Sequence, residues 1–297
     1  EIDKIDSSYT DSIIYTMAMT TQSTTKVLNT VKSLMGASLA AGELPPVISI
    51  NPSAITVKDV LTASLAETND TLSADLQALY STANYHTGSV TLPYYSGIPS
   101  IENPQAPVNA SWTARCDSGA MIAGLAATNP SAIPADTLDA NDGFCMAVGL
   151  RDFSAAFPLD TERNLTKFNP VPMPQGVSDI PHISHPGDID VQMTTPSVSP
   201  VTDAVRASYG LPALAEPQDG WPIVMLQHGI TSKKEDMLAV TGLLSAFGFA
   251  TIAIDHPLHG SRGFDLDGDS EDDINASTVS ATHYMNLASL LTTRDNL

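Results

Sequence analysis

The chain has 297 residues, enough for one large domain or two ordinary ones, each with its own hydrophobic core. Hydrophobic residues make up 42% of it, which is typical of a globular protein. Thirteen basic and 33 acidic residues give a formal net charge of −20. Because such a surface repels a phosphate backbone, the charge argues against nucleic-acid binding, but it identifies no other partner.

The two cysteines, Cys116 and Cys145, are too few for a zinc finger and form no C-x-x-C motif. In an oxidising compartment they can pair, and closing a loop of about 30 residues stabilises a fold by about 3 kcal/mol. Two free buried thiols are the alternative. The sequence opens on a charged segment, residues 1–4, without a visible signal peptide, as an exported protein would after removal of its leader.

Residues 1–82 are expected to form an accessory N-terminal region. Residues 11–23 alternate between apolar and polar positions, which predicts a strand. A helix is expected to follow from residue 24, because apolar residues then recur at helical spacing. Residues 57–65 and 72–80 show the same spacing and predict two more helices.

A second region, residues 83–297, is expected to begin with an outer strand at about 85–95, where Pro93 marks an edge or a strand end. Residues 97–186 are rich in Pro, Asn, Asp and Ser and have little periodicity. We therefore expect an irregular insertion there, held by the two cysteines. Alternation returns at about 188–194, which predicts a strand that re-enters the domain.

The segment after Trp221 is the best organised and sets the predicted fold class, α/β. Residues 223–226 (IVML) are a continuous apolar run, typical of a strand buried on both faces of a parallel sheet. A helix is predicted at 234–247, ending near Gly248, and a second buried strand at 251–254. Strand, helix and strand together predict a right-handed crossover. The predicted helix and second strand also account for the mostly apolar stretch 237–254, which would otherwise suggest a membrane span.

Distinctive residues follow both strands: QHGIT at 227–231 and DHPLHGS at 255–261. In open α/β sheets the functional site lies at the carboxyl ends of the strands. A His-Gly-x turn at such a place lets the next backbone N–H, that of Ile230, point into the site as a donor of an oxyanion hole. Position 229 is expected to need glycine, because a side chain there would block the approach to this N–H.

This arrangement resembles the early core of the α/β-hydrolase superfamily. Four stretches in order, MTTQS (19–23), VTLPYYSGIPS (90–100), QHGIT with the following KEDML, and MNLASLLTTRDNL (285–297), together resemble the bacterial extracellular lipases with a virulence-factor-type N-terminal region. That family includes surface lysophospholipases, and the resemblance covers nearly the whole chain. It implies a serine carboxylic-ester hydrolase that acts on a lipid or another ester, outside the cell or on the bacterial outer membrane.

The sequence departs from this family at the nucleophile. An α/β hydrolase places its serine in a G-x-S-x-G elbow after the next strand, followed by the acid and the histidine. No G-x-S-x-G occurs here, and the nearest match, residues 36–40 (GASLA), lies in a helical pattern. We therefore expect an N-terminal part of an α/β-hydrolase fold, truncated before the elbow and inactive alone, with the serine beyond Leu297. Its C-terminal half is then a candidate partner as a separate fragment.

Within this interpretation the expected catalytic contributions are the Ile230 N–H and Gly229. The expected pocket residues come from both loops; they are Gln227, His228, Thr231, Leu258 and His259. His228 is expected to shape the turn more than to touch substrate or the triad.

Two other functions remain open. The chain is alternatively a non-catalytic binding or assembly module that a partner chain completes. A parallel sheet that stops after two core strands would then expose an apolar edge and face. It is also compatible with a related hydrolase acting on peptides or small carbon esters, since the same loops serve all of these enzymes.

No cofactor is expected, with one exception. The acidic run 265–273 is interpreted as a solvated loop, and calcium is the alternative. The run is no EF-hand, because Gly268 stands at its fourth place and no Glu at its twelfth. The weak ligand candidates are Asp265, Asp267 and Asp269. The H-x-x-H pairs at 182–185 and 256–259 lack the further ligand that zinc needs.

Overall fold

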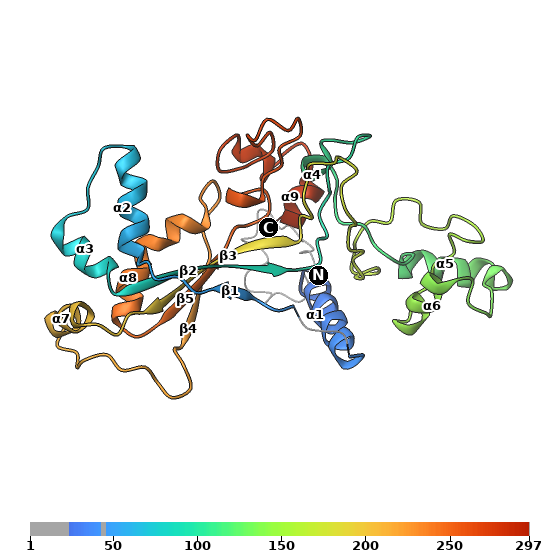
Figure 1. Cartoon of the computed structure of the whole chain (residues 1–297). Coiled ribbons are helices and arrows are strands. Elements are labelled where there is room, and N and C mark those ends of the chain that lie inside the picture. The colour runs from blue at the N-terminus through green and yellow to red at the C-terminus, as the bar shows by residue number, and fades with distance from the viewer. Residues whose placement is uncertain (1–23, 43–45, 297) are drawn as a thin grey trace, which may run out of the picture.

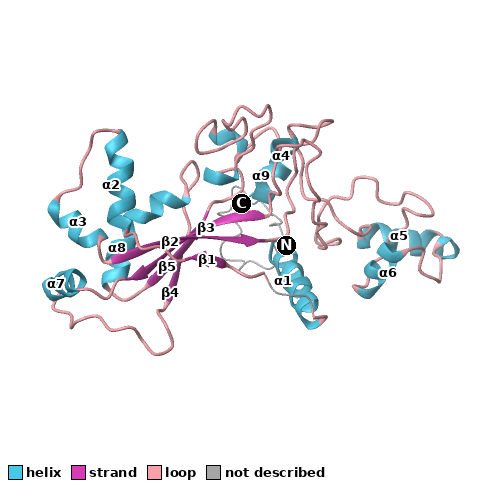
Figure 2. Cartoon of the chain, viewed as in Figure 1, coloured by secondary structure: helices cyan, strands magenta, loops and turns pink. Residues whose placement is uncertain are grey.

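A computed structural model of the chain describes residues 24–42 and 46–296, so the strand predicted at 11–23 lies outside the described residues. The described part of the chain contains nine α-helices and one five-stranded mixed sheet (Figures 1 and 2). The helices are α1 (Thr24–Ala40), α2 (Val57–Glu67), α3 (Ala74–Tyr80), α4 (Ala106–Asn109), α5 (Gly119–Thr128), α6 (Ala140–Ala147), α7 (Pro200–Ser208), α8 (Leu238–Ala246) and α9 (Leu290–Asn296). The strands are β1 (Ser49–Asn51), β2 (Ala83–Thr91), β3 (Asp188–Pro196), β4 (Ile223–Leu226) and β5 (Ala250–Ile254).

The sheet has the order β1-β2-β3-β5-β4. Its neighbours are antiparallel except β4 and β5, which run parallel and are joined through α8. The predicted α/β class is therefore confirmed at the level of helices packed with one mixed sheet, and so is the strand, helix, strand unit. The predicted outer strand corresponds to β2, which ends at Thr91, earlier than expected. The expectation of an outer strand is wrong in this structure, because β1 pairs with β2 on the side away from β3. Beyond Thr91 the Leu92 N–H bonds to Gly187 O, and Pro93 has no N–H to continue a ladder.

The helices α2, α3 and α8 gather over one face of the sheet (Figure 1). Leu238 at the start of α8 packs there with Val57 and Tyr80, and all three are buried. The opposite face has its own cluster around Val90 and Val191. Full burial of such side chains contributes about 1.5–3 kcal/mol each, so the sheet is held by apolar contacts on both sides over β2 and β3.

The apolar stretch at 237–254 is divided by a turn at Gly248. The helix begins with a 3-10 turn at Lys234–Met237, and α8 then runs to Ala246. Gly248 has φ = 86°, the left-handed conformation that ends a helix and favours glycine, and β5 follows directly. Within residues 24–42 and 46–296, no helix has the combined length and apolar character that a bilayer crossing requires.

The strand β4 differs from its prediction. It forms the edge of the described sheet, since only β5 pairs with it, and Ile223 and Met225 are 59% and 80% exposed. The expectation of a strand buried on both faces is therefore wrong for β4 in this structure. Met225 pairs with Ile252, so these side chains and the exposed Ile254 share one apolar face. The physical reason is that a strand is covered by the strands and helices next to it, and a continuous apolar run does not reveal how many of these there are.

The insertion at 97–186 is more regular than expected, because it contains α4, α5 and α6. Figure 1 shows α5 and α6 well away from the sheet. Cys116 and Cys145 form a disulfide, which confirms the paired alternative. Arg151 binds the buried carboxylate of Asp142 at 2.8 Å and holds its pKa at about 2. A disulfide and buried ion pairs thus replace a large apolar core in this part of the chain.

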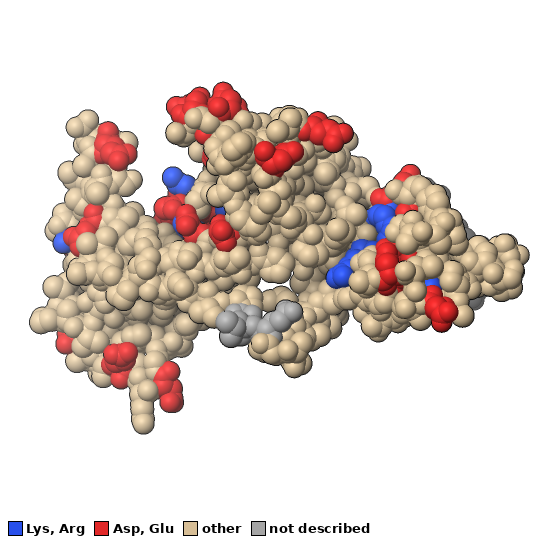
Figure 3. Space-filling model, turned by 45° about the vertical axis from the view of Figure 1, so that its right-hand side comes forward, with Lys and Arg blue, Asp and Glu red and all other residues tan. Residues whose placement is uncertain are grey.

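The charged surface follows the composition. On the face shown in Figure 3, acidic side chains are spread over the whole molecule and basic ones gather in few places. This distribution leaves no continuous basic surface on that face for a polyanion.

The exposed edge generates a first prediction. Because β4 offers unpaired backbone groups beside apolar side chains, the chain should self-associate with increasing concentration. Met225→Lys places a charge at this edge and should weaken association roughly tenfold or more. Sedimentation velocity over a concentration series measures both.

Met146→Lys is the matched control, because Met146 is an exposed methionine on α6, far from the sheet. A wild-type chain that stays monomeric at all concentrations, or equal association of the two variants, contradicts the prediction.

Candidate active site

The loops that follow β4 and β5 are joined by a buried ion pair. Lys234 Nζ lies 2.7 Å from Asp255 Oδ2, and the backbone N–H of Lys234 donates to Oδ1 at 2.7 Å. Ser261 donates to the same carboxylate through its N–H and its hydroxyl, each at 3.0 Å. Asp255 is completely buried. One carboxylate therefore fixes the start of the helical segment after β4 against the turn after β5.

The pair stays ionised in spite of its burial. Burial alone lowers the pKa of Lys234, but the hydrogen bonds to Asp255 and Glu235 outweigh this and raise it. Burial likewise raises the pKa of Asp255, and the hydrogen bonds from Lys234 and Ser261 overcome that effect and lower it. At neutral pH both groups are therefore charged.

The His-Gly turn places one backbone amide where the sequence predicts an oxyanion donor. Ile230 is exposed, and its N–H donates no hydrogen bond to any described residue. A Cβ built on Gly229 meets nothing within 4 Å, so a side chain there would contact no described residue at its first carbon. Thr231 follows with φ = 69°, an uncommon conformation for a β-branched residue. Its N–H donates to His259 Nε2 at 3.2 Å, which helps to hold the strained backbone.

Three imidazoles support the turn from behind. His228 Nε2 accepts the His256 N–H at 3.0 Å, so Nδ1 carries the proton and donates to Gly229 O at 2.8 Å. His259 Nε2 accepts from Thr231, and its Nδ1 donates to Pro257 O at 2.9 Å. Burial lowers the pKa of His256 and His259, which favours the neutral rings that this network requires.

The structure divides the predicted site residues into two groups. The backbone turn itself is open to solvent, at Gln227, Gly229, Ile230 and Thr231. The other three are at most 3% exposed, and they are His228, Leu258 and His259. These three position the turn and present no surface to a substrate in the described chain. Substrate contact by the exposed residues stays a prediction.

Sequence reasoning missed the importance of Lys234 and assigned no role to Asp255 beyond its place after the strand. The available signal was an acidic residue directly after one apolar run and a lysine at the start of the helical segment that follows the other, since a crossover brings these two places together. Another missed residue is Arg262, whose NH1 donates to Asp255 O at 3.0 Å.

One group of carboxylates has the geometry of a metal site. Asp265, Asp267 and Asp269 each offer an oxygen, and these oxygens lie within 4.8 Å of one another. Asp265 is already held by the N–H groups of Gly268 and Ser270, and these bonds lower its pKa, so it is ionised at neutral pH. Among the described residues the H-x-x-H pairs form no such group of ligands.

The chain matches no protein-family model, no curated protein and no solved structure. The functional argument therefore depends on the residues and the geometry described above.

The ion pair generates a second prediction. Asp255→Asn leaves the Lys234 ammonium buried without its partner and should cost about 3 kcal/mol of unfolding free energy. Because folding lowers the pKa of Asp255, its stabilising contribution is present at neutral pH and is lost as the pH falls below its ordinary value of 3.8. Urea denaturation at pH 7 and at lower pH measures both effects.

Asp70→Asn removes an exposed carboxylate far along the chain from this site and serves as the control, with little expected change. Equal stability of the Asp255 variant and the wild type at pH 7 contradicts a structural role for the pair.

Proposed function

We propose that the chain carries the oxyanion side of a serine carboxylic-ester hydrolase, as the N-terminal part of an α/β-hydrolase fold. The observation that carries the proposal is the Ile230 N–H, which donates no hydrogen bond within the described residues and belongs to an exposed residue in the loop after a parallel strand. The crossover from β4 through α8 to β5 and the sequence resemblance to extracellular lipases support it.

In this proposal the turn stabilises negative charge on the carbonyl oxygen of the ester. The Ile230 N–H donates one hydrogen bond to that oxygen, and a second donor comes from the amide that follows the serine. The neutral His228 and His259 rings hold the turn in place without adding a proton of their own to the reaction. Preorganisation matters here because a donor that is already fixed needs no reorganisation when charge develops.

The serine comes from a segment that contains G-x-S-x-G, a motif that the 297 residues lack. We propose that this segment adds a strand beside β4, as a later part of the same polypeptide or as a separate fragment. The unpaired edge of β4 and the apolar face around Met225 are suited to such an addition. A binding or assembly module completed by a partner uses the same edge, and it is the alternative function.

The proposed substrates are lipid esters, including lysophospholipids, and the proposed location is outside the cell or on the bacterial outer membrane. The disulfide between Cys116 and Cys145 supports an oxidising compartment. The choice of lipid esters as substrates comes from the family resemblance, and no feature of the described residues supports it independently.

Two measurements test the catalytic proposal. The 297-residue chain should not be labelled by a fluorophosphonate probe for reactive serines, since it lacks the nucleophile elbow. In a natural polypeptide that joins this chain to a G-x-S-x-G segment, Ile230→Pro removes the donor N–H and should lower kcat about 100-fold or more.

Ile230→Ala is the matched control, because it shortens the side chain and keeps the N–H. Stoichiometric labelling of the chain alone would refute the missing nucleophile, and equal kcat for the Pro and Ala variants would refute the role of the turn. Absence of any G-x-S-x-G partner segment in the native assembly would favour the binding module.

We also propose that Asp265, Asp267 and Asp269 bind calcium, since hard cations prefer several carboxylate oxygens in a flexible loop. Calcium at about ten times its Kd should raise the free energy of unfolding by about 1.4 kcal/mol. Thermal unfolding with and without calcium measures this. The double variant Asp267→Asn/Asp269→Asn should lose the effect, and Asp70→Asn, an exposed aspartate elsewhere, should keep it. No calcium effect on the wild type excludes the site.

A further inference from the structure

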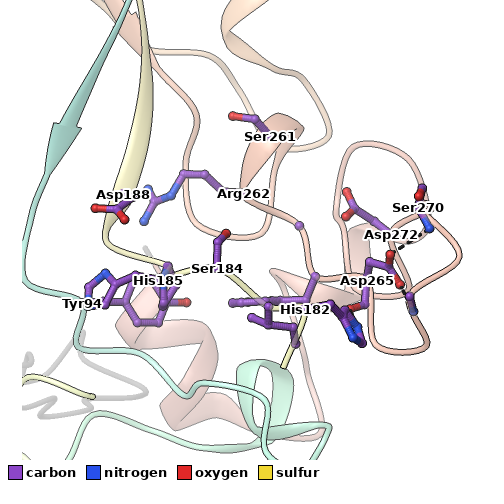
Figure 4. Close-up of a pocket in the computed structure, with 15 residues that line it drawn as sticks. Tyr94, His182, Ser184, His185, Asp188, Ser261, Arg262, Asp265, Ser270 and Asp272 are labelled. Carbon is purple, nitrogen blue, oxygen red and sulfur yellow. Dashed lines mark hydrogen bonds between the residues drawn. The ribbon is translucent and has the colours of Figure 1, made fainter. Parts of the chain in front are cut away.

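A cavity of about 370 Å³ lies between the loop after β5 and the segment that leads into β3 (Figure 4). Its walls include Tyr94 from the segment after β2, Ser184 from the segment before β3 and Asp188 at the start of β3. The loop after β5 contributes Arg262, Asp265 and Asp272. Ile230 does not line it, so this space is distinct from the proposed oxyanion turn. The volume is within the range of pockets that hold small ligands.

Arg262 is the cation of this cavity, and it has no ionic partner. One N–H of its guanidinium donates to Asp255 O, while its Nε is buried and has no hydrogen-bond partner among the described residues. Arg262 forms no ion pair in the described part of the chain. The Asp255 carboxylate is already bound by Lys234. Since an enclosed cation without a partner is costly, the arrangement favours an anion from outside.

The neighbouring side chains do not supply that anion. Burial raises the pKa of Tyr94 to about 12, so its phenol is neutral at pH 7. Burial also raises the pKa of Tyr284, which is the other phenol close to Arg262. Asp188, which Figure 4 draws on the guanidinium side of the cavity, forms no ion pair with Arg262; it is exposed and accepts the Thr91 hydroxyl at 2.7 Å. No described side chain forms an ion pair with the guanidinium, which leaves it available to the anionic group of a ligand.

The side of the cavity away from the guanidinium carries two further carboxylates. Figure 4 shows Asp265 and Asp272 across the space from the Arg262 guanidinium, with the Ser184 side chain between the two sides. A ligand with only negative charges would be attracted at one side and repelled at the other. A ligand with an oxyanion at one end and a cation at the other satisfies both sides.

We propose that this cavity binds a small zwitterion, with its oxyanion group on the fork of Arg262 and its cationic group toward Asp265 and Asp272. A phosphodiester with an ammonium group and an amino carboxylate share this chemistry. Ser184 adds a hydroxyl donor for the oxyanion. The site does not depend on ester hydrolysis, because binding requires no nucleophile.

Calorimetric titration of the wild-type chain in EDTA-containing buffer tests the proposal with four soluble probes. Glycerophosphocholine and glycine betaine are zwitterions with a phosphodiester and a carboxylate, respectively. Glycerol 3-phosphate and choline each carry one half of the charge pattern. One zwitterion should bind at least about 10-fold more tightly than either half, and which one binds identifies the anionic group.

Arg262→Gln should abolish that binding. Lys167→Gln removes the same charge from an exposed residue outside the cavity and should leave binding unchanged. If Arg262→Gln does not fold, Arg262→Lys keeps the charge, loses the fork and should weaken binding about 10-fold. In the wild type, the buried Arg262 Nε–H should give an NMR cross-peak that shifts with the zwitterion and is missing from the Lys variant.

Failure of both zwitterions to bind overturns the proposal. So does binding that the Arg262 variants leave intact, or equally tight binding of glycerol 3-phosphate or choline. A negative esterase assay has no bearing on these outcomes, so the two proposals fail separately.

Discussion

The buried carboxylate of Asp255 is the constraint on which the candidate site depends. It accepts four hydrogen bonds, two from Lys234 and two from Ser261, and so joins the segments that leave two neighbouring parallel strands. Such a pair adds little net stability relative to an apolar pair, but loss of one partner is expensive. Its main contribution is therefore to position the chain. It sets the distance between the two loops and so limits where the His-Gly turn can lie.

The polar network continues from this pair toward the solvent. His228 Nε2 lies 3.7 Å from Asp255 Oδ1, and the buried rings of His228 and His259 contact each other and the half-buried ring of His256. In each ring Nε2 accepts a hydrogen bond from an N–H group, so Nε2 carries no proton. The arrangement therefore requires the tautomer that is protonated on Nδ1. Protonation of His259 would place two donors face to face at Thr231, so the shape of the turn is linked to the charge of a ring behind it.

The sequence predicted those parts of the fold in which local pattern and spatial result coincide. The 3.6-residue period of α8 and the glycine at 248 define the crossover, and β3 and β5 follow from alternating or continuous apolar residues. The exposed state of β4 was not predictable, because it depends on which strand lies beside it. The α5 helix was missed since its sequence, GAMIAGLAAT, has small and apolar residues all round and no distinct face.

The same distinction holds for the site. His228 and Ile230 were identifiable because their motif is local, and the turn is where the sequence places it. The partners of Asp255 and the enclosed position of Arg262 arise from residues that the crossover and the 97–186 segment bring together. Composition and spacing contain no record of these contacts. Burial also reverses the expected role of Leu258 and His259, which support the turn from inside.

The long excursion between β2 and β3 has a consequence for how this protein tolerates change. Thr91 and Asp188 are paired in the ladder although 97 positions separate them. The entropy of closing a loop grows only with the logarithm of its length, so a connection eight times longer than a tight 12-residue one costs about 2 kcal/mol more. Because α5 and α6 stand away from the sheet and Cys145 of α6 is tied to Cys116 by a disulfide, a change in the length of this excursion need not alter the register of the ladder between β2 and β3.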